Sequence, residues 1–404
     1  MAGKTNKLRR DLNILWSSNA HFSNSGYGVF TRDLLFRLRD DGWEPKELAF
    51  WGLQGHKQEI DGIEVYPCMG DPYGSDALLN HSIDAKINVA FTMQDVWSLQ
   101  PEALAGLKQN NIPWIPYVPI DTEPVPDAIL QRLNMAYKII TFSKYGQKKL
   151  EDQGYASKLI VEGIDTNIFK PMDNKQELRT KFNLPQDTFI FSMIAANKEN
   201  PPRKGFQEAL EAFQLFNKNH PNSGIFFHTQ QTAPGGFPIQ DYARYLGVDK
   251  NTFYMNPYAA TYKADSVLVN EEINAVDCVL HPSMTEGFGL GVIEGQSCGK
   301  PVIIQDCTSM PELIIEGKTG WACKTQKKWW RTSGGYIFMA DVNSLHEKME
   351  EVFLADKEQV AKEGRKNIVD NYNIDTIFKE SWVPLMESLQ EELLPNVDKK
   401  EIKL

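Results

Sequence analysis

Short apolar runs alternate with helical patterns along almost the whole chain. Residues 29–40 carry apolar side chains at helical spacing. Ser143 suits the N-cap of another helix over 144–153, which Gly154 would end. This rhythm predicts a parallel sheet with right-handed crossovers. The strands predicted in this half lie at 12–16, 87–92, 114–118 and 138–142.

The rhythm restarts after a polar, proline-containing stretch at 167–186, which we interpret as a linker. The loop 325–335 contains the run Lys-Lys-Trp-Trp-Arg and reads as an insertion. We therefore predict two α/β, Rossmann-like, doubly wound domains, residues 1–168 and 169–376, facing a central cleft. The later strands are predicted at 189–194, 225–228, 252–255, 278–281 and 301–304, and the last helices at 342–355, 357–371 and 377–394.

The 404 residues carry a formal net charge of −10, which disfavours nucleic-acid binding without excluding it. Lys4, Lys7, Arg9 and Arg10 form a local basic patch, although a solvated tail explains them more simply. The five cysteines include no CxxC pair, which favours reduced thiols. No signal peptide and no apolar run of about 20 residues is apparent. We expect a cytoplasmic protein for which peripheral membrane contact stays possible.

The densest candidate chemistry lies at 281–298, after a predicted buried strand and before a helix. Closely spaced glycines let the backbone approach a ligand and expose N–H groups at a helix N-terminus, where phosphate is favoured. Glu286 and Glu294 flank this loop. A carboxylate accepts hydrogen bonds from a pair of vicinal hydroxyls. The combination suits a nucleotide sugar better than a structural turn with a helix-dipole glutamate.

This segment, continued by Gly-Lys-Pro-Val-Ile-Ile and by Ser-Met-Pro-Glu-Leu near 309–313, resembles family 4 of the retaining glycosyltransferases (glycosyl transferases group 1). The resemblance implies the GT-B fold, with the donor on the second domain and the acceptor on the first. It also implies that the C-terminal helix, about 377–404, packs back on the first domain. Glu286 would contact the transferred sugar and Glu294 the ribose. The implied loop contacts to the donor are Gly287, Phe288, Gly289 and Leu290.

A basic segment at 195–206 resembles the part of the family that clamps the donor pyrophosphate. Lys204 matches the family lysine, but Lys198 stands where the family has arginine. Either Lys198 or Arg203 would supply the second charge. In the segment 161–171, Glu162 replaces the usual Asn or His, so donor binding and a structural hinge both stay open for it.

The first domain offers weaker signals. Gly26 and Gly28 lie in a glycine loop that opens a helix and resembles the family's N-terminal loop near the donor phosphates. Asp95 and Asp121 each follow a predicted strand, in a region where the family often has a His or Asp at the reacting face of the sugar. For both aspartates, a role in acceptor activation or sugar binding and a structural role in N-capping or loop solvation are equally open.

No two aspartates are separated by a single residue, and no HExxH or clustered His/Cys spacing occurs. We therefore expect no metal and no cofactor, and charge on the leaving group would be met by Lys204, its basic neighbour and the loop amides. The sequence predicts a metal-independent retaining glycosyltransferase with a nucleoside diphosphate sugar donor. The acceptor would be a hydroxyl of a glycan, lipid or small molecule. Alternatives are the same chemistry on modified DNA, or a catalytically inactive nucleotide- or sugar-binding protein.

Overall fold

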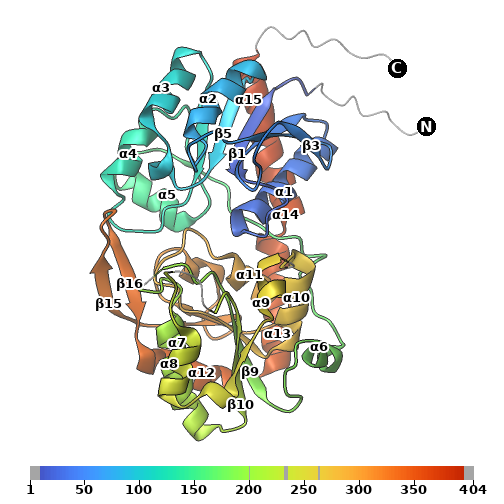
Figure 1. Cartoon of the computed structure of the whole chain (residues 1–404), viewed down its shortest axis with the longest axis vertical. Helices are drawn as coiled ribbons and strands as arrows, with labels where there is room; N and C mark the ends of the chain where they lie inside the picture. Colours follow the sequence, from blue (N-terminus) through green and yellow to red (C-terminus); the bar gives the residue numbers. More distant parts are fainter. Residues whose placement is uncertain (1–9, 200, 232–234, 263, 395–404) are drawn as a thin grey trace, which may run out of the picture.

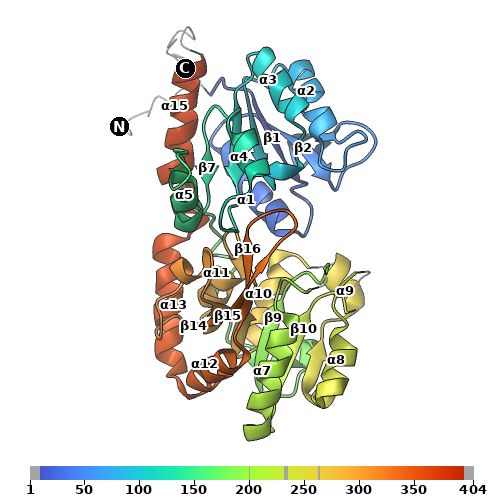
Figure 2. The same cartoon turned by 90° about the vertical axis from the view of Figure 1, so that its left-hand side faces the viewer.

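The computed structural model describes residues 10–394, apart from 200, 232–234 and 263. Two sheets lie in separate halves of the molecule, the first built from the early part of the chain and the second from the later part (Figure 1). Helices flank both sheets (Figure 2). The predicted α/β class with two doubly wound domains is confirmed.

The first sheet has eight strands, and neighbouring strands run parallel except for the pair β3–β4. β1 pairs with both β2 and β5, so the winding direction reverses between β1 and β5. Ligands of such sheets bind beyond the carboxyl ends of the strands at this reversal. In sheet order the strands are β3 (Gln58–Ile60), β4 (Ile63–Pro67), β2 (Pro45–Trp51), β1 (Ile14–Asn19), β5 (Val89–Met93), β6 (Trp114–Val118), β7 (Ile140–Thr141) and β8 (Lys158–Leu159).

The second sheet has six strands, all parallel to their neighbours. β9 pairs with both β10 and β12, which places a second reversal between β9 and β12. In sheet order the strands are β11 (Thr252–Tyr254), β10 (Ser223–His228), β9 (Phe189–Ile194), β12 (Cys278–His281), β13 (Val302–Gln305) and β14 (Gly320–Cys323).

The helices bury one face against these sheets. In α1, the Ser25 side chain accepts a hydrogen bond from the Gly28 amide at 3.1 Å and so caps the helix. Phe30, Leu34 and Leu38, at helical spacing, are buried. The first-half helices are α1 (Gly26–Asp40), α2 (Ser75–Asp84), α3 (Pro101–Gln109), α4 (Asp127–Leu133) and α5 (Lys144–Glu151). The later ones are α6 (Lys175–Lys181), α7 (Phe206–Asn219), α8 (Ile239–Leu246), α9 (Pro257–Tyr262), α10 (Ser266–Ala275), α11 (Leu290–Ser297), α12 (Val342–Leu354) and α13 (Lys357–Asn371).

The stretch 167–186 is not a free linker, because α6 lies within it. Arg179 of α6 donates hydrogen bonds to the Asp277 carboxylate at 2.7 Å and to the Ala275 carbonyl at 3.0 Å, which ties the helix to the second domain. The chain crosses between the sheets nearer to Ile164, which pairs with Asn373 in an isolated bridge. The boundary between residues 168 and 169 stays a prediction.

The C-terminal segment returns to the first sheet. It consists of α14 (Ile374–Ile377), a π-helical turn (Phe378–Trp382) and α15 (Val383–Leu393), and Figure 1 shows α15 in the half that contains β1. The Trp382 ring lies edge-on to Trp16 and Tyr117, with centroid distances of 5.7 and 5.3 Å. The described part of this segment therefore packs on the first domain, and residues 395–404 lie outside the described residues.

The predicted insertion forms an antiparallel hairpin of β15 (Thr325–Trp330) and β16 (Tyr336–Ala340). It follows β14 of the second domain and reaches the loop after β6 of the first. The Tyr336 amide donates a hydrogen bond to the Glu123 carbonyl at 2.8 Å, and Lys328 Nζ lies 3.0 Å from Glu123 Oε1. The hairpin thus links the two domains beside the space between them.

Candidate active site

The reversal point of the second sheet brings two loops together. The loop after β9 and the loop after β12 meet at Gly205, where an added Cβ would lie 2.2 Å from the Pro282 carbonyl oxygen. Gly205 also has φ of +76°, so glycine suits both the backbone angle and the close approach. The Met284 amide donates to the Arg203 carbonyl at 2.8 Å. This packing places Arg203 and Lys204 beside Glu286.

Glu286 is the centre of a partly buried charge cluster. Its Oε1 lies 2.5 Å from Lys204 Nζ and 3.0 Å from His281 Nε2, while its Oε2 lies 3.9 Å from Arg203 Nη1. Burial alone would raise the pKa of Glu286, but Lys204, His281 and Arg203 hold that pKa well below its usual range. Glu286 is therefore an ionised acceptor, and burial lowers the pKa of the Lys204 ammonium that faces it.

Arg203 and Lys198, the two candidates for the second basic group, occupy different positions. Arg203 Nη1 donates to the Thr285 carbonyl at 2.8 Å, and its Nε donates to Glu199 at 3.0 Å. The Lys198 side chain is exposed. The structure brings Arg203, but not Lys198, to Glu286.

The glycine loop lies between the domains. An added Cβ on Gly287 would lie 2.7 Å from Pro119 Cβ of the first domain, so this position has no room for a side chain. Gly289 precedes α11, and the Phe288 side chain is buried, so only the backbone of Phe288 can face a ligand. Ser309 Oγ lies 2.8 Å from the Glu286 carbonyl oxygen and 2.7 Å from that of Phe288, so its hydroxyl proton is shared between them and holds the loop.

The N-termini of α1 and α11 face each other. An added Cβ on Gly26, the first residue of α1, would lie 3.4 Å from the Leu290 side chain at the start of α11. Gly28 is tightly enclosed by the Ser23 and Ala20 carbonyls. The Gly28 N–H is already bonded to the Ser25 hydroxyl. The N-termini of both helices carry partial positive charge, so they suit phosphate oxygens.

Glu294, which is half-buried, and Glu162, which is buried, are carboxyls with shifted pKa values. Burial, with a contribution from Asp33 of α1, raises the pKa of Glu294 to about 7. Glu162 follows β8, is 4% exposed, and its carboxyl forms no hydrogen bond among the described residues. Burial, with the charges of Glu286 and Glu294, raises its pKa to about 8. Glu162 therefore faces the two glutamates of the donor motif from the first domain.

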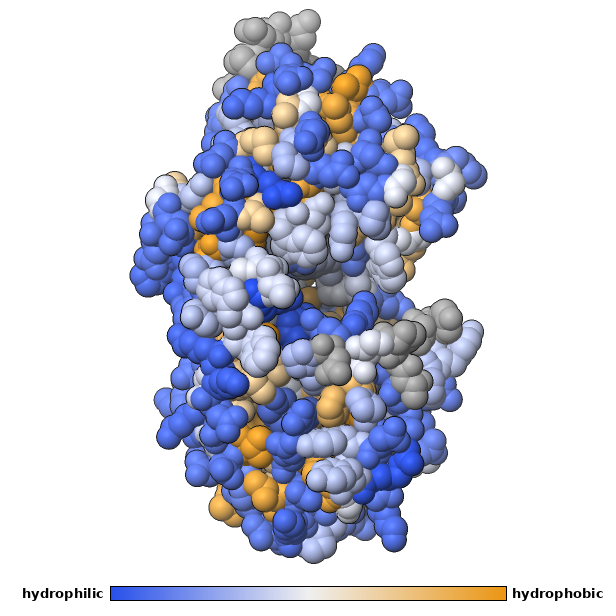
Figure 3. Space-filling model, turned by 60° about the vertical axis from the view of Figure 1, so that its left-hand side comes forward, coloured by the Kyte–Doolittle hydropathy of each residue, from blue (hydrophilic) through white to orange (hydrophobic). Residues whose placement is uncertain are grey.

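Asp95 and Asp121 follow β5 and β6, at the reversal of the first sheet. Burial of its carboxyl and the charge of Asp121 raise the pKa of Asp95 to about 6, although the residue as a whole is exposed. Burial also raises the pKa of Asp121, opposed by Arg203 and Arg331. Figure 3 shows a hollow between the two halves. The Thr285 hydroxyl donates a hydrogen bond to the Asp121 carbonyl, so Asp121 lies where the first domain meets the second.

Three further residues belong to this cluster. His281 holds Glu286, as described above. Burial and the charges of Asp95, Glu162 and Asp121 raise the pKa of the Tyr27 hydroxyl well above its usual value. Arg331 of the hairpin lies 3.9 Å from Asp121. Each stands in a segment that the sequence had singled out: Tyr27 lies between Gly26 and Gly28, His281 opens the segment 281–298, and Arg331 ends the Lys-Lys-Trp-Trp-Arg run.

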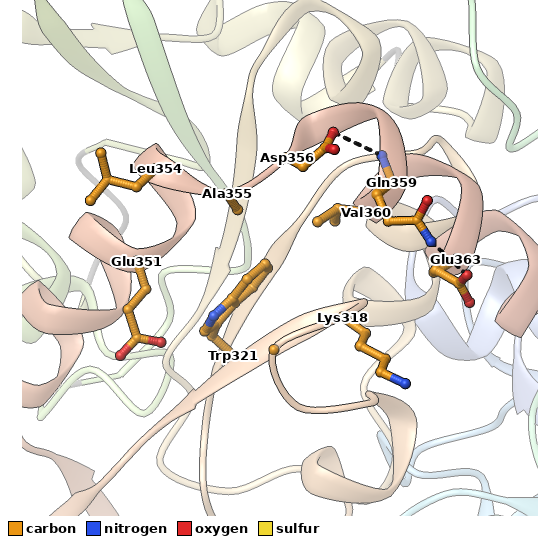
Figure 4. A pocket seen from close by; sticks show the side chains of 10 residues that line it. Lys318, Trp321, Glu351, Leu354, Ala355, Asp356, Gln359, Val360 and Glu363 are labelled. Carbon is orange, nitrogen blue, oxygen red and sulfur yellow. Dashed lines mark hydrogen bonds between the residues drawn. The ribbon is translucent and has the colours of Figure 1, made fainter.

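A second hollow lies away from this cluster. It is a pocket of the second domain near α12 and α13, lined among others by Lys318, Trp321 and Leu354 (Figure 4). Asp356 and Glu363 in this pocket accept hydrogen bonds from Gln359. It contains none of the predicted site residues.

Two absences concern only the described residues. Over 10–394, outside the gaps named above, no three His, Cys, Asp or Glu side chains are grouped so that they could hold a metal ion. Within the same part of the chain, no helix has the length and apolar character needed to cross a bilayer. Lys4, Lys7 and Arg9 of the basic patch lie outside the described residues, whereas Arg10 is paired with Glu387 at 2.7 Å.

Comparisons with known proteins agree with this geometry. Residues 174–351 match the family of glycosyl transferases group 1. A D-inositol 3-phosphate glycosyltransferase from Corynebacterium glutamicum is 26% identical over 168 residues, which are 40% of this chain and 38% of that relative. The chain thus spans well under half the length of this curated relative.

Solved structures extend the likeness to nearly the whole chain. Sucrose-phosphate synthase from Thermosynechococcus elongatus has a TM-score of 0.73 at 17% identity, covering 95% of this chain and 99% of that one. Anabaena HepE in complex with UDP and glucose has a TM-score of 0.68 at 16% identity, covering 93% and 100%. The chain therefore has the GT-B fold, and its second domain belongs to the glycosyl transferases group 1 family.

Proposed function

We propose that this protein transfers a glycosyl group from a nucleoside diphosphate sugar to a hydroxyl acceptor, with retention at the anomeric carbon and without a divalent metal. One observation carries the proposal: the partly buried Lys204–Glu286 pair, with Arg203, stands at the reversal point of the second sheet and faces the aspartates of the first. That position is where doubly wound domains bind ligands. HepE, a structural neighbour, binds UDP and glucose.

In the proposed reaction, the bond between the anomeric carbon and the diphosphate oxygen breaks. The acceptor oxygen bonds to the same face of that carbon, and its proton passes to the leaving diphosphate. Negative charge grows on the diphosphate during this step. Lys204, Arg203 and the N–H groups at the starts of α1 and α11 are positive groups placed to stabilise it.

The carboxyls have separate roles in this proposal. Glu286 accepts hydrogen bonds from hydroxyls of the transferred sugar, because its neighbours keep it ionised. Glu294 accepts from the ribose hydroxyls. Asp95 or Asp121 positions the acceptor hydroxyl.

Binding of UDP and turnover of UDP-glucose test the donor site. We expect UDP at about 100 times its dissociation constant to stabilise the protein by roughly 2.7 kcal/mol. Lys204→Ala and Glu294→Ala are expected to abolish this stabilisation, whereas Lys218→Ala, an exposed lysine of α7, retains it. If the site variants bind and turn over like the native protein, the assignment is wrong.

The stereochemistry and the metal requirement are tested separately. NMR of the glycosylated product is expected to show the anomeric configuration of the donor, and an inverted product would overturn the retaining mechanism. Activity is expected to persist in EDTA, and a strict requirement for added metal would contradict metal independence. The cytoplasmic location also stays a prediction.

A further inference from the structure

Four exposed aromatic side chains lie beyond the carboxyl ends of the first sheet. Phe22 follows β1, Trp51 ends β2, Tyr73 follows β4 and Trp97 follows β5. They are 40%, 55%, 40% and 44% exposed, respectively. Large rings are costly to leave in water, so their concentration at the ligand edge of one sheet points to a binding surface.

The four residues stand at or just after the ends of strands that are neighbours in the sheet, in the order β4, β2, β1 and β5. The Tyr73 and Trp97 rings are 5.8 Å apart, and the Phe50 ring lies 6.5 Å from Tyr73. An added Cβ on Gly52, the residue after Trp51, would lie 3.6 Å from the Phe22 ring, so the segments that follow β1 and β2 approach each other. We call Phe22, Trp51, Tyr73 and Trp97 the aromatic row, and Trp97 stands two residues after Asp95 along the chain.

The charges around the aromatic row distinguish between classes of acceptor. The loops 20–25, 52–57, 68–74 and 94–100 contain one lysine and no arginine. That residue, Lys57, is 3.1 Å from Glu64 and so is already paired. Nucleic acids and anionic lipids are bound by clusters of cations, which these loops lack. The chain as a whole carries a charge of −10, which also disfavours binding of nucleic acids and anionic lipids.

Rings and carboxylates together suit sugars. One face of a pyranose presents C–H groups that pack on an aromatic ring, and its hydroxyls at the edge donate to carboxylates. A row of rings would contact several sugar units in succession. The carboxylate of Asp95 would meet the hydroxyl at the end of the chain.

We propose that the aromatic row binds a neutral carbohydrate chain of several sugar units and places its terminal hydroxyl at Asp95. This inference rests on the proposed glycosyl transfer and names the acceptor class of that site. It gives the first-domain side of the cleft a polymeric ligand of low charge, rather than a nucleic acid or an anionic lipid.

Binding to immobilised probes tests the inference: neutral oligosaccharides from disaccharides to hexasaccharides, oligo-dT and phosphatidylglycerol vesicles. We expect at least one neutral hexasaccharide to bind more tightly than its disaccharide. Trp51→Ala and Trp97→Ala should each weaken this binding roughly tenfold, about 1.4 kcal/mol. The matched control is Tyr245→Ala, which removes an exposed ring from α8 and should bind like the native protein.

Three outcomes would overturn the inference: no neutral oligosaccharide binds, the two tryptophan variants bind like the native protein, or oligo-dT or the vesicles bind through these tryptophans instead. Thermal melts of each variant check folding. The stabilisation of the native protein by UDP, measured in parallel, reports on the donor site alone. Its absence would count against the proposed function, whereas its presence without oligosaccharide binding would count against this inference only.

Discussion

Two carboxyl groups beside the cleft, those of Glu286 and Glu162, differ in their neighbours. Glu286 faces Lys204, His281 and Arg203, and its pKa lies well below its usual range. Glu162 faces other carboxylates, and its pKa is raised to about 8. At neutral pH the first is an acceptor of hydrogen bonds, while the second is mostly protonated and can donate one. Residues of the same type thus have opposite hydrogen-bonding capacities within one site.

Glu286→Gln keeps the shape of the side chain and removes its charge. We expect turnover of UDP-glucose to fall by roughly a hundredfold or more, a loss typical of removing one positioned polar group at a reacting centre. Steady-state kinetics measure the effect. Glu347→Gln, at an exposed position of α12, is the control and should keep native kinetics. Near-native turnover of Glu286→Gln would show that the proposed role of Glu286 in sugar binding is wrong.

Glu162 predicts a pH dependence. As pH rises through about 8, Glu162 ionises and adds a third negative charge beside Glu286 and Glu294, so we expect kcat/KM for an anionic donor to fall. Glu162→Gln should flatten this alkaline limb. If kcat/KM of Glu162→Gln falls at alkaline pH as it does in the native protein, Glu162 is not the group whose ionisation causes the fall.

Ionisation of Glu162 also lowers the stability of the folded protein as pH rises. Because the folded pKa lies above the ordinary value of 4.5, the stabilisation contributed by protonated Glu162 is complete below about pH 4.5 and is lost as pH rises to about 8. As pH rises across this interval, the melting temperature of Glu162→Gln should therefore increase relative to that of the native protein. A constant difference between pH 4.5 and 8 would show that Glu162 is not buried as described.

At the level of elements, the sequence predicts β6, β9, β12 and α13 with both ends as observed. These strands are short apolar runs, so periodicity identifies them. β2 was not predicted, because Glu47 interrupts its apolar run. In the fold Glu47 is buried and accepts from the His21 amide at 2.8 Å, a tertiary contact that no local pattern reveals.

The residues of the candidate site also divide into those that a local sequence motif reveals and those that only the fold brings together. Glu286 and Glu294 are recognisable because one strand, loop and helix carry both. Arg331 approaches Asp121 only because the β15–β16 hairpin crosses to the first domain. Arg331 and Asp121 lie far apart in the sequence, so no local motif could reveal their contact.

The hairpin provides a prediction at the scale of an element. An added Cβ on Gly335, where φ is +81°, would lie 2.7 Å from Thr122 Cβ and push the hairpin off the first domain. Gly317→Ala is the matched control, with φ of +71° and nothing within 4 Å of its Cβ. Both variants carry backbone strain of about 1 kcal/mol, so their difference isolates the contact.

Hydrogen exchange of the Tyr336 amide, which donates to Glu123, measures that contact. We expect faster exchange and lower turnover in Gly335→Ala than in Gly317→Ala. Equal exchange rates in the two variants would show that the position of the hairpin does not depend on the contact between Gly335 and Thr122.

At the scale of the whole molecule, the first domain is discontinuous. Its core contains Trp382, from the far end of the chain, against Trp16, Phe91 and Tyr117. Trp382→Ala is expected to destabilise the protein by about 3–5 kcal/mol through loss of burial and a cavity. Trp329→Ala, at a half-exposed position of the hairpin, should change stability by about 0.5 kcal/mol or less. Urea unfolding measures both, and equal effects would contradict the packing of Trp382.

The return of Trp382 to the first sheet has a consequence for biosynthesis. A ribosome makes every strand of both sheets before it reaches residue 382. The second sheet can therefore complete its core while the nascent first domain still exposes the rings that Trp382 will cover. The part of the protein made first is finished last, and a chain interrupted before this tryptophan presents an open aromatic surface to chaperones and proteases.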